Sequence, residues 1–172
     1  VTIMDWDATN KDDEVGLCAL PAQRVSEILR AKLGSEGTCT FPLLLNGKPV
    51  LGNDKKRAEV DLRVRILEVP LAFPYMTPEA GAKGPRLLEV TVVSAKSLPN
   101  MDGLLGSVDP YVVLMFDGVE CRTATKKREY HPVWGEAFAF ELPDVSRALN
   151  QELHVTVWDW DTTSKDDDIG TF

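Results

Sequence analysis

Apolar and polar residues alternate along several short segments of the chain, and this alternation predicts β-strands. In residues 58–69, Val60, Leu62, Val64 and Ile66 stand at every second position, with charged residues between most of them. Successive side chains of a strand point to opposite faces, so this segment has the pattern of an antiparallel strand with one buried face. We expect further strands at residues 87–93, 109–116, 119–126, 134–142 and 153–157.

Turn signals separate these segments, and helical patterning is rare. Asp117-Gly118, between two apolar segments, is typical of a two-residue hairpin turn. Residues 21–33 have the apolar spacing of one short amphipathic helix, which Gly34 is expected to end. Short strands with frequent turns and little helix predict an all-β fold, an antiparallel β-sandwich.

The two ends of the chain carry copies of one segment. Residues 1–16 (VTIMDWDATNKDDEVG) and 155–170 (VTVWDWDTTSKDDDIG) are identical at ten of sixteen positions, at an offset of 154 residues. That offset corresponds to one small domain plus a linker, so the repeat predicts two copies of one module, each incomplete. We expect the C-terminal part of one module at 1–69, a Pro/Gly-rich linker at 70–85, and the N-terminal part of a second module at 86–172.

The charge and the cysteines limit the function classes. Lys and Arg number 19 against 27 Asp and Glu, a net charge of −8. Such a chain is a poor general ligand of nucleic acid, although a local basic patch or a bound cation can still attract an anionic surface. Cys18, Cys39 and Cys121 have no C-x-x-C spacing, which argues against a disulfide framework or a zinc site and fits a reducing compartment.

Each copy of the repeat contains a dense group of aspartates. Asp159, Asp161 and residues 166–168 put five carboxylates within ten residues, and Asp102 and Asp109 lie in another loop. Carboxylates about 4 Å apart repel each other by about 1 kcal/mol even in water. Ca²⁺, which takes six to eight oxygen ligands, removes that repulsion. Solvated acidic turns are the alternative, but the repeated spacing favours a cation site, provided that the strands bring both loops to one end of the sandwich.

Two other kinds of site find little support. Counted from Asp159, the glycine and glutamate positions of an EF-hand hold Ser164 and Gly170. The sequence has no G-x-S-x-G, H-E-x-x-H or P-loop motif, so we expect a binding module and not an enzyme. A hydrolytic acid pair is the one catalytic alternative that the carboxylates allow.

Four segments together resemble the C2 domain, the module of synaptotagmins, protein kinase C and ferlins: LEVTVVSAKSLPNMDG, SVDPYV, KKREYHPVWGEAFAFEL and VTVWDWDTTSKDDDIG. The resemblance implies an eight-stranded Greek-key sandwich. Residues 86–172 would supply strands one to six and the start of seven, and residues 1–69 strands six to eight. It also implies Ca²⁺ ligands in two loops at one end: Asp102, Asp109, Asp159, Asp161, Asp167 and Ser164, with Asp5, Asp7 and Asp13 in the first copy.

The resemblance further implies Ca²⁺-dependent binding to anionic phospholipid, in signalling or membrane trafficking, by a cytoplasmic protein peripheral to the membrane. Leu104, Leu105 and Trp160 would lie near the membrane, and Lys126, Lys127 and Arg128 near lipid head groups. For the two leucines the alternative is packing within the loop, and for Trp160 it is a cover over the metal loop. For the three basic residues the alternative is a solvated edge strand. The alternative function is a Ca²⁺-independent protein-interaction or scaffolding C2 module in a larger assembly.

Neither predicted module is complete by itself, and half a sandwich would expose its core and strand edges. Both parts together supply one full set of strands. They can complete one sandwich within a chain, or by exchange in a strand-swapped homodimer. A longer tandem protein whose other parts complete both modules is the rival. Sedimentation of the 172-residue chain distinguishes these, since a monomer excludes the exchange.

Overall fold

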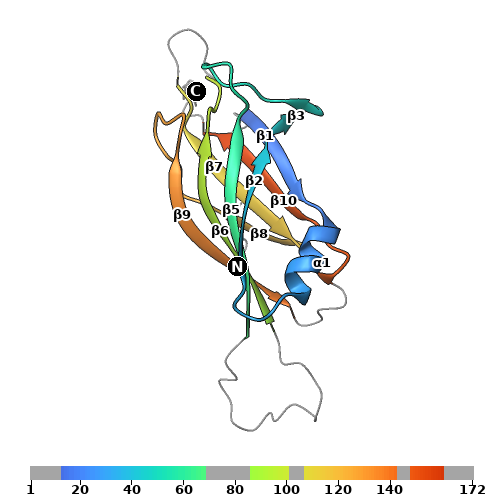
Figure 1. Cartoon of the computed structure of the whole chain (residues 1–172). Helices are drawn as coiled ribbons and strands as arrows, with labels where there is room; N and C mark the ends of the chain where they lie inside the picture. Colours follow the sequence, from blue (N-terminus) through green and yellow to red (C-terminus); the bar gives the residue numbers. More distant parts are fainter. Residues whose placement is uncertain (1–12, 69–85, 101–106, 143–147, 161–172) are drawn as a thin grey trace, which may run out of the picture.

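The computed structural model describes residues 13–68, 86–100, 107–142 and 148–160 (Figure 1). These residues form strands and one helix. The elements are, in chain order, β1 (Asp13–Leu20), α1 (Ala22–Arg30), β2 (Glu36–Pro42), β3 (Leu44–Leu45), β4 (Lys48–Pro49), β5 (Glu59–Glu68), β6 (Arg86–Lys96), β7 (Pro110–Phe116), β8 (Val119–Arg122), β9 (Val133–Leu142) and β10 (Leu153–Asp159).

Two antiparallel sheets make up the sandwich. The first has the strand order β4-β3-β1-β10-β7-β8 and the second has the order β2-β5-β6-β9. Eight of the described strands have four residues or more, and β3 and β4 have two each. The prediction of an all-β antiparallel β-sandwich with one short helix is confirmed.

Strands from both parts of the sequence share each sheet. β5 pairs with β6 from Glu59↔Lys96 to Glu68↔Arg86, and β1 pairs with β10 through Cys18↔Val155. Figure 1 accordingly shows the blue β1 next to the red β10. The predicted linker, residues 70–85, lies outside the described residues.

The apolar alternation agrees with burial inside the sandwich. Val60, Leu62 and Val64 of β5 are fully buried, and Ile66 is 1% exposed. Across the core, the rings of Phe116 on β7 and Phe140 on β9 meet edge to face at a centroid distance of 5.7 Å. The core is therefore formed by the inner faces of the two sheets, as the period of two predicts.

Several predicted boundaries differ from the structure: the strand expected over 87–93 spans 86–96, the one expected over 153–157 spans 153–159, and two other elements end earlier than expected. The strand expected over 119–126 ends at Arg122, because the Thr123 hydroxyl accepts the Val112 N–H bond (2.9 Å) that a strand carbonyl would otherwise accept. The helix expected over 21–33 spans 22–30. It stops before Gly34, whose positive φ of 77° serves the turn into β2, where its N–H donates to the Ile66 carbonyl.

Cys18 on β1 offers a test of this packing. Its side chain lies in the core, and burial raises the pKa of the thiol to about 12. The thiolate is the reactive form, so the native thiol stays protonated as well as shielded at pH 8. We expect iodoacetamide to alkylate the half-buried Cys39 and to spare Cys18 until the chain is unfolded. Peptide mass spectrometry measures both, and equal rates in the native chain would contradict the packing.

Candidate functional site

The loops before β7 and after β10 meet at one end of the sandwich. Asp159, the last residue of β10, lies opposite Pro110, the first residue of β7. The Asp109 N–H donates to Asp159 Oδ1 at 2.6 Å, and the Trp160 N–H donates to the Asp109 carbonyl at 3.1 Å. Two aspartates 50 residues apart in the sequence are therefore held side by side by backbone hydrogen bonds.

The Asp159 carboxylate lies at a buried position. It is only 1% exposed, because it continues the face of β10 that carries Leu153, Val155 and Val157 into the core. A buried carboxylate costs free energy unless hydrogen-bond donors or cations compensate it. The Asp109 N–H is one such donor. A strand that places a carboxylate on its apolar face next to a second carboxylate indicates a functional site more than a packing site.

The Asp109 side chain binds the loop that joins β8 to β9. Asp109 Oδ2 lies 3.0 Å from Lys127 Nζ, and Asp109 Oδ1 accepts the Arg128 N–H at 2.7 Å. The Lys127 ammonium also lies over the Trp160 ring, 3.1 Å from its centroid. We call Asp109, Lys127, Arg128, Asp159 and Trp160 the Asp109 cluster.

The backbone of the same loop is docked on the start of β7. The Lys126 N–H donates to the Pro110 carbonyl at 2.9 Å, and the Glu129 N–H donates to the Val108 carbonyl at 3.0 Å. Arg128, between them, has a positive φ of 53°, and its N–H is directed at Asp109. The predicted basic run therefore lies in this loop, beside the acidic residues.

Most of the other predicted site residues lie outside the described part of the chain: Asp102, Leu104, Leu105, Asp161, Ser164, Asp167, Asp5 and Asp7. Asp13 is described as the first residue of β1, and its backbone lies opposite Asp159. Among the described residues, no group of three or more His, Cys, Asp or Glu side chains is close enough to hold a metal ion. The described site thus contains two of the five carboxylates that the sequence motifs select.

The donors that are present fit a hard cation. Asp109 and Asp159 offer carboxylate oxygens, and the described part of the Asp109 cluster contains no thiol or imidazole. Oxygen ligands of this kind suit Ca²⁺ or Mg²⁺, whereas zinc and copper favour nitrogen and sulfur. The residues present are therefore compatible with the Ca²⁺ that the motifs imply.

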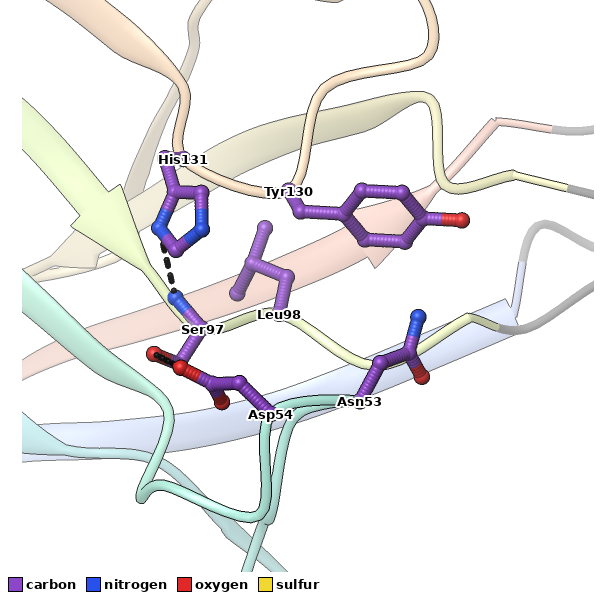
Figure 2. A pocket seen from close by; sticks show the side chains of 6 residues that line it. All are labelled: Asn53, Asp54, Ser97, Leu98, Tyr130 and His131. Carbon is purple, nitrogen blue, oxygen red and sulfur yellow. Dashed lines mark hydrogen bonds between the residues drawn. The ribbon is translucent and has the colours of Figure 1, made fainter.

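A pocket of about 230 Å³ lies where the loop after β4 meets the end of β6 (Figure 2). The Ser97 N–H donates to His131 Nδ1, and Ser97 Oγ donates to Asp54 Oδ2, each at 3.1 Å. The remaining lining residues are Asn53, Leu98 and Tyr130.

These contacts join parts of the fold and do not form a catalytic relay. A nucleophilic serine needs its hydroxyl on the base, but the Ser97 hydroxyl is bonded to a carboxylate and only its backbone N–H meets His131. Asn53 acts in the same way, because its Oδ1 accepts the Asn100 N–H at 3.1 Å. The pocket therefore anchors residues 52–56 to the chain that leads into the first acidic loop.

Sequence reasoning missed the contact between Lys127 and Asp109. The two residues are 18 positions apart, and no motif links them. The sequence does show an acidic residue in SVDPYV and basic residues in KKRE. These opposite charges predict a contact only when it is known that the loop between β8 and β9 folds back onto β7.

The sequence profile of the C2 domain matches residues 86–172. Ras GTPase-activating protein 4 of Mus musculus is 28% identical over 168 residues, which are 98% of this chain and 18% of that protein. Synaptotagmin-5 of Arabidopsis thaliana is 40% identical over 82 residues, 46% of this chain and 14% of that protein.

A solved structure is also similar in part. The crystal structure of a C2 domain of RIM from Drosophila has 24% identity and a TM-score of 0.42, over 45% of this chain and 65% of that chain. This chain spans less than a fifth of the length of the two curated relatives described above. The profile match covers just over half of the chain and includes Asp109, directly before β7, and Asp159, the last residue of β10. The chain belongs to the C2 domain family.

Proposed function

We propose that this chain is a Ca²⁺-dependent module that binds anionic phospholipid membranes in signalling or trafficking. The observation that carries the proposal is the meeting of Asp109 and Asp159 at one end of the sandwich, next to the basic run Lys126–Lys127–Arg128. Carboxylates that can hold a metal ion thus lie beside basic residues that can attract lipid phosphate. The synaptotagmin among the relatives supports a role of this class.

The proposed mechanism depends on charge at that surface. Asp109 and Asp159, with Asp102, Asp161 and Asp167 from the motifs, would hold the metal ion through carboxylate oxygens. Bound Ca²⁺ would supply positive charge and coordination positions for lipid phosphate. Asp159 contributes a carboxylate oriented by the Asp109 N–H, and Lys126 and Arg128 contribute attraction to anionic head groups.

Membrane association of this kind is peripheral. The helix of the described residues, α1, has nine residues, and no described helix is long and apolar enough to cross a bilayer. A cytoplasmic location and binding without catalysis belong to the same proposal. We also propose that both parts of the chain complete one sandwich, which the pairing of β5 with β6 and of β1 with β10 supports.

Co-sedimentation with liposomes tests the function. We expect the chain to pellet with vesicles of phosphatidylcholine and phosphatidylserine in about 1 mM Ca²⁺, a concentration at the upper end of the dissociation constants of extracellular Ca²⁺-binding modules. It should stay in the supernatant with EGTA, and with vesicles of phosphatidylcholine alone. Equal pelleting with and without Ca²⁺ would contradict the proposal.

A protein-interaction module is the second candidate. Leu17 on β1, Met115 on β7 and Val119 on β8 are each more than 40% exposed, and all three lie on the six-stranded sheet. Exposed apolar side chains on a sheet can serve a protein partner. This alternative predicts a partner that binds equally well after Asp159→Asn and Asp161→Asn.

A further inference from the structure

The Lys127 side chain is paired with a carboxylate oxygen that the proposed function assigns to a metal ion. Its ammonium lies 3.0 Å from Asp109 Oδ2 and 3.1 Å from the centroid of the Trp160 ring. It therefore neutralises a first-loop carboxylate and lies against a residue that directly follows Asp159. A metal ion on that oxygen would meet a positive charge already in place.

We propose that Lys127 is an internal competitor of Ca²⁺, which occupies Asp109 in the metal-free chain and must leave it before a metal ion can bind there. The inference rests on the proposed function, because it concerns the affinity of the same site. For Lys127 the resemblance implies a lipid contact, with a solvated edge strand as the alternative; the inference adds that this residue sets how much Ca²⁺ the site requires.

The two sides of the Asp109 carboxylate are held with different strength. Oδ1 accepts a backbone N–H bond from Arg128, which the loop hydrogen bonds of Lys126 and Glu129 keep in place. Among the described residues, Oδ2 is paired with the end of the Lys127 side chain, which is 56% exposed. Exposed ion pairs of lysine are weak and are screened by salt. The carboxylate can therefore keep its orientation while the ammonium is exchanged.

The exchange would also connect the metal to the membrane. Lys127 lies between Lys126 and Arg128 in one loop, so an ammonium released from Asp109 adds a third cation to that basic run. The same event that places a divalent ion on the carboxylate then makes one more positive charge accessible to lipid phosphate. Binding of Ca²⁺ and binding of lipid would support each other through this side chain.

Calorimetric titration of CaCl₂ into the Lys127→Met chain tests the inference. Methionine keeps the side-chain length except for the terminal nitrogen and can still pack against the Trp160 ring, while it removes the charge. We expect Ca²⁺ to bind the variant about fivefold more tightly than the unchanged chain, since the metal ion no longer has to displace an exposed ion pair that contributes up to about 1 kcal/mol. Lys126→Met is the matched control. It removes the same charge from the neighbouring residue, whose described contact with β7 is made by its backbone, and should change affinity less than about twofold.

Four outcomes are distinguishable. If Lys127→Met binds Ca²⁺ more tightly than the unchanged chain and Lys126→Met does not, the inference is supported. If Lys127→Met binds Ca²⁺ and the unchanged chain gives no calorimetric signal, the inference is also supported, but the proposed function is refuted. Equal affinities of the unchanged chain and both variants overturn the inference and leave the function standing. Silence in every chain overturns both. If Lys127→Met fails to fold, as circular dichroism would show, Lys127→Gln takes its place with the same expectation.

Discussion

Asp159→Asn should weaken Ca²⁺ binding about 100-fold and abolish Ca²⁺-dependent pelleting with anionic liposomes. The change removes a full negative charge from a carboxylate that is 1% exposed, where charge interactions are screened less than at the surface. A loss of about 100-fold corresponds to about 2.7 kcal/mol. The fold should persist, because the amide oxygen of the new side chain can still accept the Asp109 N–H that Asp159 Oδ1 accepts. Calorimetry and liposome co-sedimentation measure the two effects.

The control for this variant is Asp117→Asn. Asp117 lies in the turn at the other end of β7, with a positive φ of 47° that asparagine tolerates well. Asp117→Asn changes the net charge of the chain by the same amount as Asp159→Asn. It therefore separates the loss of a metal ligand at Asp159 from the effect of net charge on Ca²⁺ affinity. If both variants lose affinity equally, or if neither does, Asp159 does not bind the metal ion.

Gly52→Ala should destabilise the fold by about 3 kcal/mol, the upper range for overpacking. A Cβ at residue 52 would lie 2.3 Å from the Ser97 carbonyl oxygen and 2.7 Å from its carbon. Both atoms belong to the backbone, so the clash cannot be relieved by a side-chain rotation. Ser97 itself has a positive φ of 52° and bonds to Asp54 and His131, which leaves it little freedom to move. Urea unfolding followed by tryptophan fluorescence gives the free energy of unfolding.

Gly37→Ala is the matched control. Gly37 lies on the exposed strand β2 with no atom within 4 Å of the added Cβ. Alanine there should change the free energy of unfolding by less than about 0.5 kcal/mol, as at an ordinary surface position. If both variants lose the same free energy of unfolding, the predicted clash between the added Cβ of residue 52 and the Ser97 backbone is contradicted.

Different parts of the candidate site were open to prediction to different degrees. Asp159 could be selected because the aspartates of its segment recur at the same spacing in both copies of the repeat, and Asp109 could be selected through the C2-like segment SVDPYV. Lys127 could not be assigned to Asp109, since that contact depends on how the loop between β8 and β9 folds back. The end of β8 was missed for a similar reason. The Thr123 hydroxyl replaces a backbone acceptor, and hydrophobic alternation carries no information about such a bond.

Local sequence patterns were sufficient for the strands from β5 to β10, the hairpin turn at Asp117-Gly118 and the all-β class, because the period of two and the turn residues act within a few positions of one another. They did not give the bounds of β1 to β4. Tertiary structure alone decided which strands are neighbours, and therefore which loops share an end. The pairing of β10 with both β1 and β7 brings residues 13, 109 and 159 together. Such contacts join positions far apart in the chain, and their free energy comes from the core between the sheets, which no local pattern specifies.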